Sequence, residues 1–157
     1  MPLGIALTKP ITPSNWRNHP QIVEIRAVYQ QVLALVQTGR RYKAKTFAYC
    51  PSLDLVCRLY TDGRGVARRY AVSGGGEDSS YSFDHIYDSQ GRLRFVLVIG
   101  SAVDKSFLEL RYYLGVDGTV LWVDRRQGGP GYTWIVNPLA FFARQPQQAF
   151  AAPDPCK

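Results

Sequence analysis

His85 is the side chain in this sequence whose chemistry comes nearest to that of a general base. It lies in a segment flanked by arginines, whose charge would depress its pKa and favour the neutral form. Catalysis would also need a nucleophile, a metal or a partner acid, yet the chain has no H-E-x-x-H, G-x-S-x-G or P-loop pattern. We therefore expect no catalytic residues, no metal site and no cofactor, and an enzyme centred on His85 is an alternative.

Arginine dominates the basic side chains of the protein. The 19 lysines and arginines outnumber the 12 aspartates and glutamates, which gives a formal net charge of +7, and 14 of the 19 are arginines. An arginine offers a planar pair of donors to carboxylates and phosphates, and it stacks on aromatic rings. This composition indicates anionic partners, and a charged soluble surface without a specific ligand also explains it.

The length and composition indicate one globular domain over residues 1–157. A chain of 157 residues buries enough surface to fold without a metal or a disulfide, and 46% of its residues are hydrophobic against 20% charged. No apolar run approaches the roughly 18 residues that a membrane-spanning helix needs, so we expect no membrane span.

Three cysteines are present, and none has the spacing of a metal or redox motif. Cys50 and Cys57 flank a turn-like stretch at 51–54, so in a hairpin they could lie opposite each other and form a disulfide. Two small buried side chains are the other interpretation, and we expect Cys156 to be free and exposed. Residues 1–8 lack the basic start and the apolar length of a signal peptide.

A helix is predicted over residues 19–39, after an irregular arm at 1–18. Asn18 can cap this helix, Pro20 fits its first turn and Gly39 ends it. Its apolar side chains recur at steps of three and four residues and form one stripe, which consists of Ile22, Ile25, Tyr29, Val32, Leu33 and Val36. The stripe predicts that this helix lies on an apolar surface.

From residue 42 onward the hydrophobic period changes to two, which is typical of β-strands. Strand-like runs lie at about 42–50, 55–61, 66–73, 80–87, 92–99, 106–114, 119–125 and 132–136. Turns rich in Asp and Gly recur between them, and Gly65, Gly91 and Gly118 are 26 and 27 residues apart. Connections this short exclude crossover helices and predict an antiparallel up-and-down meander over 42–136.

The predicted fold class is α+β, with an N-terminal amphipathic helix packed on one face of an antiparallel up-and-down β-meander of about seven or eight strands. A tail follows at 137–157. The turn positions predict four pairings, which are Arg69 with Asp84, Ile86 with Leu93, Leu97 with Leu108 and Tyr112 with Leu121. The core face under the helix would then consist of Ala67, Ala71, Ile86, Leu93, Phe95, Leu97, Leu108, Leu110, Tyr112, Leu121 and Val123. A salt bridge between Arg69 and Asp84 would lie on that same face.

The same register places five side chains in one row on the opposite face, namely Arg68, His85, Arg94, Arg111 and Trp122. Neighbouring rows are rich in tyrosine and phenylalanine, which is unusual for a face in water. Three interpretations remain open. The tail with Phe141 and Phe142, or the N-terminal arm, covers the rings; the face binds an anionic ligand or a protein partner; or it forms a homodimer interface.

Four short motifs resemble those of an uncharacterised group of small exported bacterial β-meander proteins. They are Tyr-Thr-Asp-Gly at 60–63, Gly-Gly-Glu-Asp-Ser-Ser at 75–80, His-Ile-Tyr-Asp-Ser-Gln-Gly-Arg-Leu-Arg-Phe at 85–95 and Glu-Leu-Arg-Tyr-Tyr at 109–113. The resemblance covers about residues 18–125, and the element at 87–92 is also similar to single YD repeats of large bacterial surface proteins. The resemblance to the exported β-meander proteins implies an exported chain with a leading helix and a meander, and hence a periplasmic or secreted setting.

These observations predict a non-enzymatic binding or interaction module that works through the basic-aromatic face of the sheet. The arginines of the row would grip carboxylate or phosphate groups and Trp122 would stack on the ligand. The resemblance implies a place in the bacterial cell envelope. Binding of single-stranded nucleic acid is an alternative, although lysine is scarce and Glu109 and Asp124 interrupt the face.

Overall fold

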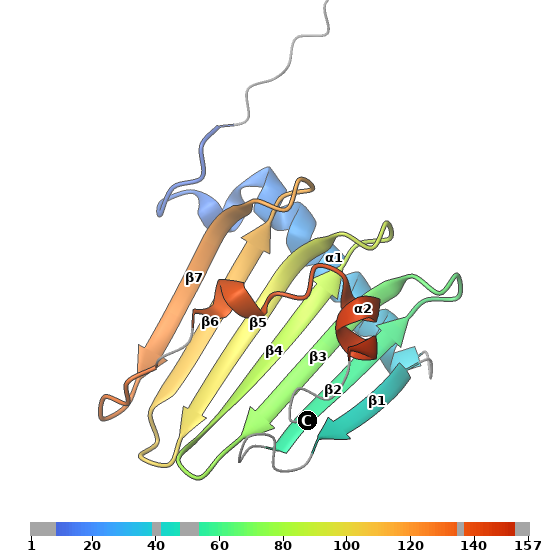
Figure 1. Ribbon diagram of the computed structural model, residues 1–157. Helices are drawn as coiled ribbons and strands as arrows, with labels where there is room; N and C mark the ends of the chain where they lie inside the picture. Colours follow the sequence, from blue (N-terminus) through green and yellow to red (C-terminus); the bar gives the residue numbers. More distant parts are fainter. Residues whose placement is uncertain (1–8, 39–41, 48–53, 135–136, 153–157) are drawn as a thin grey trace, which may run out of the picture.

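Seven antiparallel strands form one sheet in the computed structural model, which describes residues 9–38, 42–47, 54–134 and 137–152 (Figure 1). Each strand pairs with the next one along the chain, so the order across the sheet is β1-β2-β3-β4-β5-β6-β7. The predicted α+β class and the up-and-down meander are thereby confirmed. Within the described ranges, no helix has both the length and the apolar character needed to cross a bilayer.

The helices and strands are joined by short connections. The strands are β1 Tyr42–Phe47, β2 Asp54–Thr61, β3 Ala67–Gly75, β4 Ser79–Tyr87, β5 Leu93–Ala102, β6 Phe107–Leu114 and β7 Val120–Gly128. The helices are the 3₁₀ helix η1 Trp16–Asn18, α1 Pro20–Thr38, the 3₁₀ helix η2 Pro138–Phe141 and α2 Pro146–Ala151. Residues 132–134 of the predicted last strand are not in a strand, and 135–136 lie outside the described residues.

The repeated glycines form the turns that the sequence predicts. Gly65, Gly91 and Gly118 have φ angles of 81°, 77° and 84°, a region that glycine enters without steric cost. In the first two of these turns an aspartate, Asp62 or Asp88, accepts backbone N–H groups through its side chain. These three turns lie at one end of the sheet and fix where each hairpin begins.

Each of these three hairpins carries a bulge just after its turn, and this overturns the predicted pairing. Arg68, Arg94 and Leu121 are extra residues, because the neighbouring pairs skip them. Ile86 therefore pairs with Phe95 and not with Leu93. In the β3–β4 hairpin, which has no bulge, Arg69 pairs with Ile86 and not with Asp84. A bulge switches the facing of the residues that precede it, since side chains alternate along a strand.

The register between β5 and β6 also differs from the prediction, by three residues. Leu97 pairs with Arg111 and not with Leu108, because the turn runs from Ala102 to Ser106 with Lys105 at a φ of 70°. An odd shift exchanges the two faces of a strand. On β7 the partner of Tyr112 is Val123 and not Leu121.

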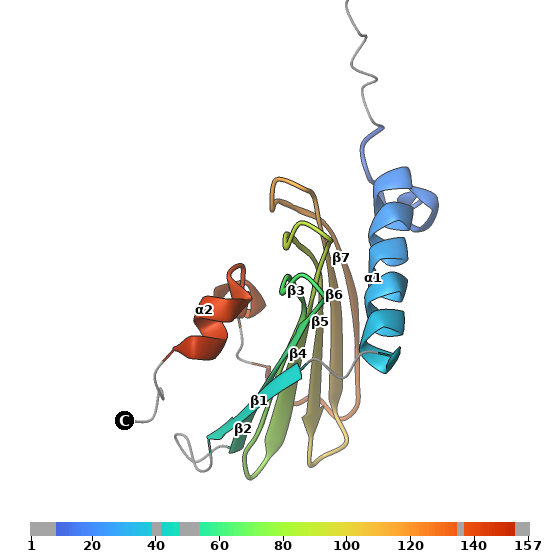
Figure 2. The same cartoon turned by 90° about the vertical axis from the view of Figure 1, so that its right-hand side faces the viewer.

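Helix α1 covers one face of the sheet, here called the helix side, where it packs on β4, β5 and β6 (Figure 2). The predicted stripe is confirmed, because Ile22, Ile25 and Val32 are fully buried there. The sheet contributes Ile86, Phe95 and Tyr113 to this layer, with Leu97 and Leu121 partly buried. The predicted core face was partly wrong, since six of its members lie on the other side, namely Ala67, Leu93, Leu108, Leu110, Tyr112 and its partner Val123.

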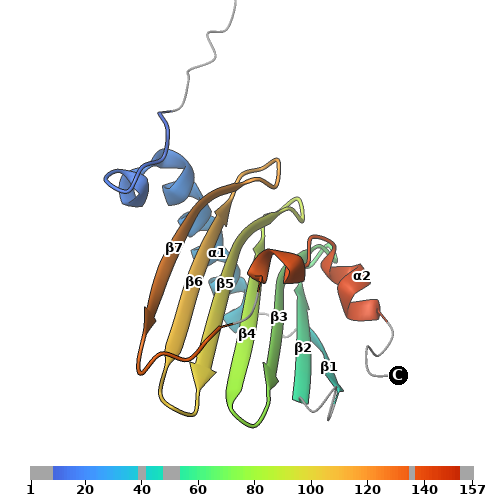
Figure 3. The same cartoon turned by 60° about the vertical axis from the view of Figure 1, so that its left-hand side comes forward.

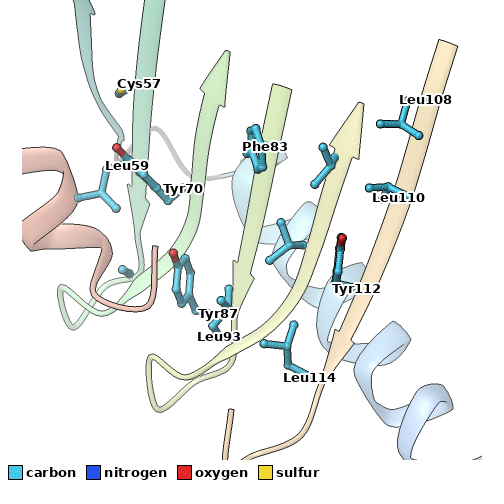
Figure 4. Packing of buried hydrophobic residues seen from close by; sticks show 13 residues of the cluster. Cys57, Leu59, Tyr70, Phe83, Tyr87, Leu93, Leu108, Leu110, Tyr112 and Leu114 are labelled. Atoms are coloured by element: carbon cyan, nitrogen blue, oxygen red, sulfur yellow. The ribbon is translucent and has the colours of Figure 1, made fainter. Parts of the chain in front are cut away.

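The opposite face, here called the tail side, holds the larger apolar cluster (Figure 4). It includes Phe83, Tyr87, Val98 and Leu110 from the central strands. The C-terminal segment lies over this face, with η2 in front of β4 and α2 beside β2 (Figure 3). Of the three interpretations of the aromatic face, coverage of rings by the tail is therefore the one that the structure displays.

Candidate binding surface

One row of mostly aromatic side chains runs across all seven strands on the helix side. Consecutive backbone pairings connect its members, which are Tyr42, Tyr60, Arg69, Ile86, Phe95, Tyr113 and Trp122. Residues paired in this way point to the same face of a sheet. We call this set the aromatic row.

The β5–β7 end of the aromatic row is part of the interface with the N-terminal elements. Trp16 stacks on Trp122, with ring centroids 5.7 Å apart and planes at 20°, and it also contacts Tyr113 at 6.0 Å. Tyr29 of α1 packs on Phe95 at 4.9 Å. Aromatic pairs at such spacings stabilise a fold beyond the area that they bury, so this end serves the structure.

The β1–β2 end of the aromatic row is open. Tyr42 and Tyr60 stack with centroids 5.4 Å apart, and 55% of Tyr42 is exposed. Among the described side chains of β1 and β2 that point to the helix side, none is buried. The guanidinium of Arg69 lies 5.3 Å from the centroid of the Tyr60 ring and holds it in place.

Farther along the sheet, at the level of Val56, the helix side carries small and hydroxyl-bearing side chains. Going down β2 from Tyr60, the helix-side residues are Arg58 and Val56, and Val56 pairs with Ser73 on β3. Ser73 in turn pairs with Ser82 on β4. A shallow hollow of about 300 Å³ lies here, lined by Val56, Ser73, Gly74, Gly75, Ser80, Tyr81, Ser82 and Ile99. We call the surface from Tyr42 to Ser82 the open strip; it consists of Tyr42, Ala44, Val56, Arg58, Tyr60, Ser73 and Ser82.

The open strip carries little net charge. Arg58 is exposed. Arg69 is neutralised by Asp84, because its Nε and Nη2 donate to the two carboxylate oxygens at 2.7 and 2.8 Å. This ion pair confirms the predicted Arg69–Asp84 salt bridge, although the two residues are diagonal neighbours and not directly paired. What the strip offers to a ligand is a flat pair of rings, one exposed guanidinium and hydroxyl groups.

Two of the five predicted ligand-binding residues lie in the bulges. Arg68 and Arg94 are buried, and Arg94 is only 2% exposed. The Nε of Arg68 donates to the carbonyl oxygen of Tyr87 at 3.2 Å. Arg94 donates from Nε to Leu114 O and from both Nη atoms to the carboxylate of Glu24 on α1, each at 3.0 Å. All three nitrogens of Arg94 are thus engaged within the protein.

His85 lies on the tail side and is 1% exposed. The backbone N–H of Ala143 donates to its Nε2 at 3.2 Å, so Nδ1 carries the proton and donates to Tyr70 O at 2.9 Å. Burial lowers the pKa of His85, because the charged imidazolium is poorly solvated there, although the hydrogen bond to Tyr70 acts the other way. A neutral imidazole with both nitrogens bonded is a structural contact, and no substrate reaches it while the tail is in place.

Arg111 and Trp122 lie on the helix side, away from His85. Arg111 is half-buried and donates from Nε to Glu109 Oε1 at 2.7 Å. Trp122 is stacked beneath Trp16. Trp122 is a member of the aromatic row, and Arg111 lies on the same face. The five predicted residues, however, do not form one row. The bulges and the β5–β6 register explain the separation.

The sequence prediction of the two faces started at residue 67, in β3, and therefore did not include the open strip on β1 and β2. A signal for it was present, since a hairpin centred on residue 51 pairs Tyr42 with Tyr60. Cys57 lies buried on the tail side, and it forms no disulfide with another described residue. Cys50 and Cys156 lie outside the described residues, so the Cys50–Cys57 disulfide stays a prediction.

Within the described residues, no group of three or more His, Cys, Asp or Glu side chains is placed to hold a metal ion. No protein-family model matches the chain, and neither the curated proteins nor the solved structures give a match. The residues of the open strip are therefore the basis for a functional proposal.

Proposed function

We propose that the protein is a non-enzymatic binding module whose contact surface is the open strip, and that its ligand is an extended, weakly anionic oligosaccharide. The observation that carries this proposal is the stacked Tyr42–Tyr60 pair at the uncovered end of the aromatic row, in which Tyr42 is exposed and Tyr60 is half-buried. Exposed aromatic rings on an otherwise polar surface are typical of binding sites.

The chemistry of the strip favours a sugar chain. The tyrosine rings offer apolar faces on which the C–H groups of a sugar can pack. Arg58 offers donors that suit a carboxylate, and Ser73 and Ser82 can exchange hydrogen bonds with sugar hydroxyls. The shallow hollow beside the serines gives such a chain room to lie along the sheet.

The same chemistry disfavours single-stranded nucleic acid. A nucleic acid carries one charge per nucleotide, and proteins bind it with a track of basic side chains. In the strip the charge of Arg69 is cancelled by Asp84, and only Arg58 is exposed. A ligand with widely spaced carboxylates matches this surface better than a polyphosphate.

A cell-envelope setting, which the sequence resemblance implies, is part of this proposal. Envelopes and extracellular matrices are rich in acidic polysaccharides, and a basic protein meets them readily. The net charge of +7 would bring such a polymer to the molecule, while the strip would hold it.

The proposal can be tested by calorimetric titration of the full chain with a largely methyl-esterified oligogalacturonate, in which only a few widely spaced carboxylates remain charged. A neutral glucose oligomer of the same length and a single-stranded oligo-dT serve as comparisons. Tyr42→Ala should weaken binding of the oligogalacturonate by ~10-fold through lost stacking, and Arg58→Gln by a similar factor through the lost ion pair. The matched control is Val116→Ala, which changes an exposed side chain in the β6–β7 turn and should leave affinity unchanged.

Two outcomes would overturn the proposal. One is the absence of binding to the oligogalacturonate, or an equal effect of all three substitutions. The other is binding of oligo-dT alone with a steep loss of affinity as salt rises, which would assign the surface to nucleic acid.

A further inference from the structure

On the tail side, β4 hydrogen-bonds both backbone polar groups of one residue of the C-terminal segment, Ala143. The hydroxyl of Tyr87 donates to the carbonyl oxygen of Ala143 at 2.5 Å. The N–H of Ala143 donates to His85 Nε2 at 3.2 Å. His85 and Tyr87 stand two residues apart on β4 and point to the same face, so one donor and one acceptor from the sheet clasp both sides of one residue.

Aromatic contacts flank this clasp. The ring of Phe142 stands edge-on to His85 and to Tyr112, with centroids 6.2 and 5.0 Å apart. The ring of Phe141 contacts Phe83 at 5.7 Å. On the other side of the clasp, Arg144 Nη1 donates to the carbonyl oxygen of Gly118 at 2.9 Å. Residues 141–144, with the sequence Phe-Phe-Ala-Arg, are thus recognised position by position.

The rest of the segment is more exposed, although Gln147 Nε2 donates to Gly65 O at 3.1 Å and Lys45 Nζ donates to Phe150 O at 2.5 Å. No residue of η2 is buried, and Phe141 and Leu139 are 60% and 50% exposed. In α2 the buried residue is Pro146. A hollow of about 450 Å³ lies between α2 and the turns that contain Gly65 and Gly91. A segment with specific anchors at residues 141–144 and much exposed surface on either side of them has the character of a bound peptide.

We propose that the tail side of β4–β6 is a binding groove for an extended protein segment with two adjacent aromatic residues followed by a small and a basic residue, and that residues 141–144 occupy it as an internal ligand. The occupant that the groove awaits is such a segment of a partner protein. This inference uses a different face and different residues from the open strip, so either one can fail without the other.

Competition with the attached segment sets the expected behaviour. A tethered ligand has an effective concentration in the millimolar range, so a free peptide must overcome it. Weakening the internal segment frees the groove without changing its walls. Phe142→Ala removes the ring that contacts His85 and Tyr112, while His85, Tyr87 and Tyr112 remain.

The experiment measures fluorescence anisotropy of a labelled synthetic peptide that spans residues 138–148. The full chain with Phe142→Ala should bind this peptide at least ~10-fold more tightly than the wild type does. Leu139→Ala is the matched control, because Leu139 is exposed in the same segment, and it should behave as the wild type. Adding Tyr87→Phe to the Phe142→Ala chain should weaken capture of the peptide about fivefold, since the donor to the carbonyl oxygen is lost.

A second peptide tests the clasp without altering the protein. Methylation of the backbone nitrogen at the Ala143 position removes the donor to His85 and should weaken capture by a similar factor. The inference is overturned if the Phe142→Ala chain melts cooperatively, as the wild type does, yet binds no peptide. It is also overturned if capture is indifferent both to Tyr87→Phe and to backbone methylation, or if the chain instead forms dimers by exchanging tails.

Discussion

Arg68 and Arg94 occupy equivalent positions in two hairpins, 26 residues apart. Each is the extra residue of a bulge that follows a turn glycine. Each donates from Nε to the carbonyl oxygen of the last residue in the following strand. Arg68 donates to Tyr87 O of β4 at 3.2 Å, and Arg94 donates to Leu114 O of β6 at 3.1 Å. Each also lies near the aspartate of its own turn, at 3.7 and 3.6 Å. The sequence repeat is therefore a repeat of side-chain bonding, in which one arginine ties neighbouring turns together.

Replacing these two arginines should lower the free energy of unfolding by different amounts. Arg94→Ala should cost about 3 kcal/mol, because it removes a buried guanidinium with several hydrogen bonds and leaves Glu24 without its ion pair. Arg68→Ala, which has no contact of that kind with α1, should cost about 2 kcal/mol. Urea denaturation measures both values. Arg125→Ala, an exposed change on β7, is the control and should stay within about 0.5 kcal/mol; equal costs at Arg68 and Arg94 would contradict the bonding described.

The stability of the fold should depend on pH through His85. Its pKa in the folded chain is lowered, mainly by burial, whereas in the unfolded chain it is about 6.5. The unfolded state therefore binds the proton more readily, so stability is complete above about pH 6.5 and is lost as the pH falls below it, by at most ~1.4 kcal/mol per pH unit. His85→Gln should flatten this part of the profile, as measured by urea denaturation across pH. A parallel slope in the variant would refute the assignment.

Much of the fold could be predicted because its signals are local. The glycines at 65, 91 and 118 mark turns that demand positive φ, and the helix stripe has a clear period. Phe141 and Phe142 also indicated that the tail must find an apolar surface. Local chemistry of this kind is visible in the sequence without knowledge of the partner strands.

The faces of the sheet could not be predicted in the same way. The bulges at Arg68 and Arg94 have no distinctive residue type, yet each one exchanges the facing of its neighbours. The β5–β6 turn places Lys105 in the left-handed region, where the sequence pattern leads one to expect glycine. The predicted row of five side chains required every one of these registers to be correct. Because several differ in the structure, the five side chains lie in different places.

The turn glycines should differ sharply from other glycines in their tolerance of alanine. Gly91 has a φ of 77°, and an added Cβ would meet Val66 only at an ordinary 3.5 Å, so the cost is one of backbone strain. We expect Gly91→Ala to lower the free energy of unfolding by about 1 kcal/mol. Gly63→Ala is the control, because no atom lies within 4 Å of its Cβ position and its φ is not positive; thermal melts should show it neutral or slightly stabilising.

The indole of Trp134 packs on the tail side directly over Gly100 of β5. A Cβ at Gly100 would lie 2.7 Å from Cζ3 of that indole, closer than such atoms approach, and the ring also packs edge-on against Tyr81 at 5.6 Å. Gly100→Ala must therefore displace the indole into water. We expect a red shift of tryptophan emission and a loss of about 2 kcal/mol in the free energy of unfolding. At Gly75, the last residue of β3, the nearest atom to a new Cβ is Ser80 Cβ at 3.6 Å, an ordinary contact. Gly75→Ala should leave the emission unchanged, and a similar spectrum for both variants would show that the indole is not seated on Gly100.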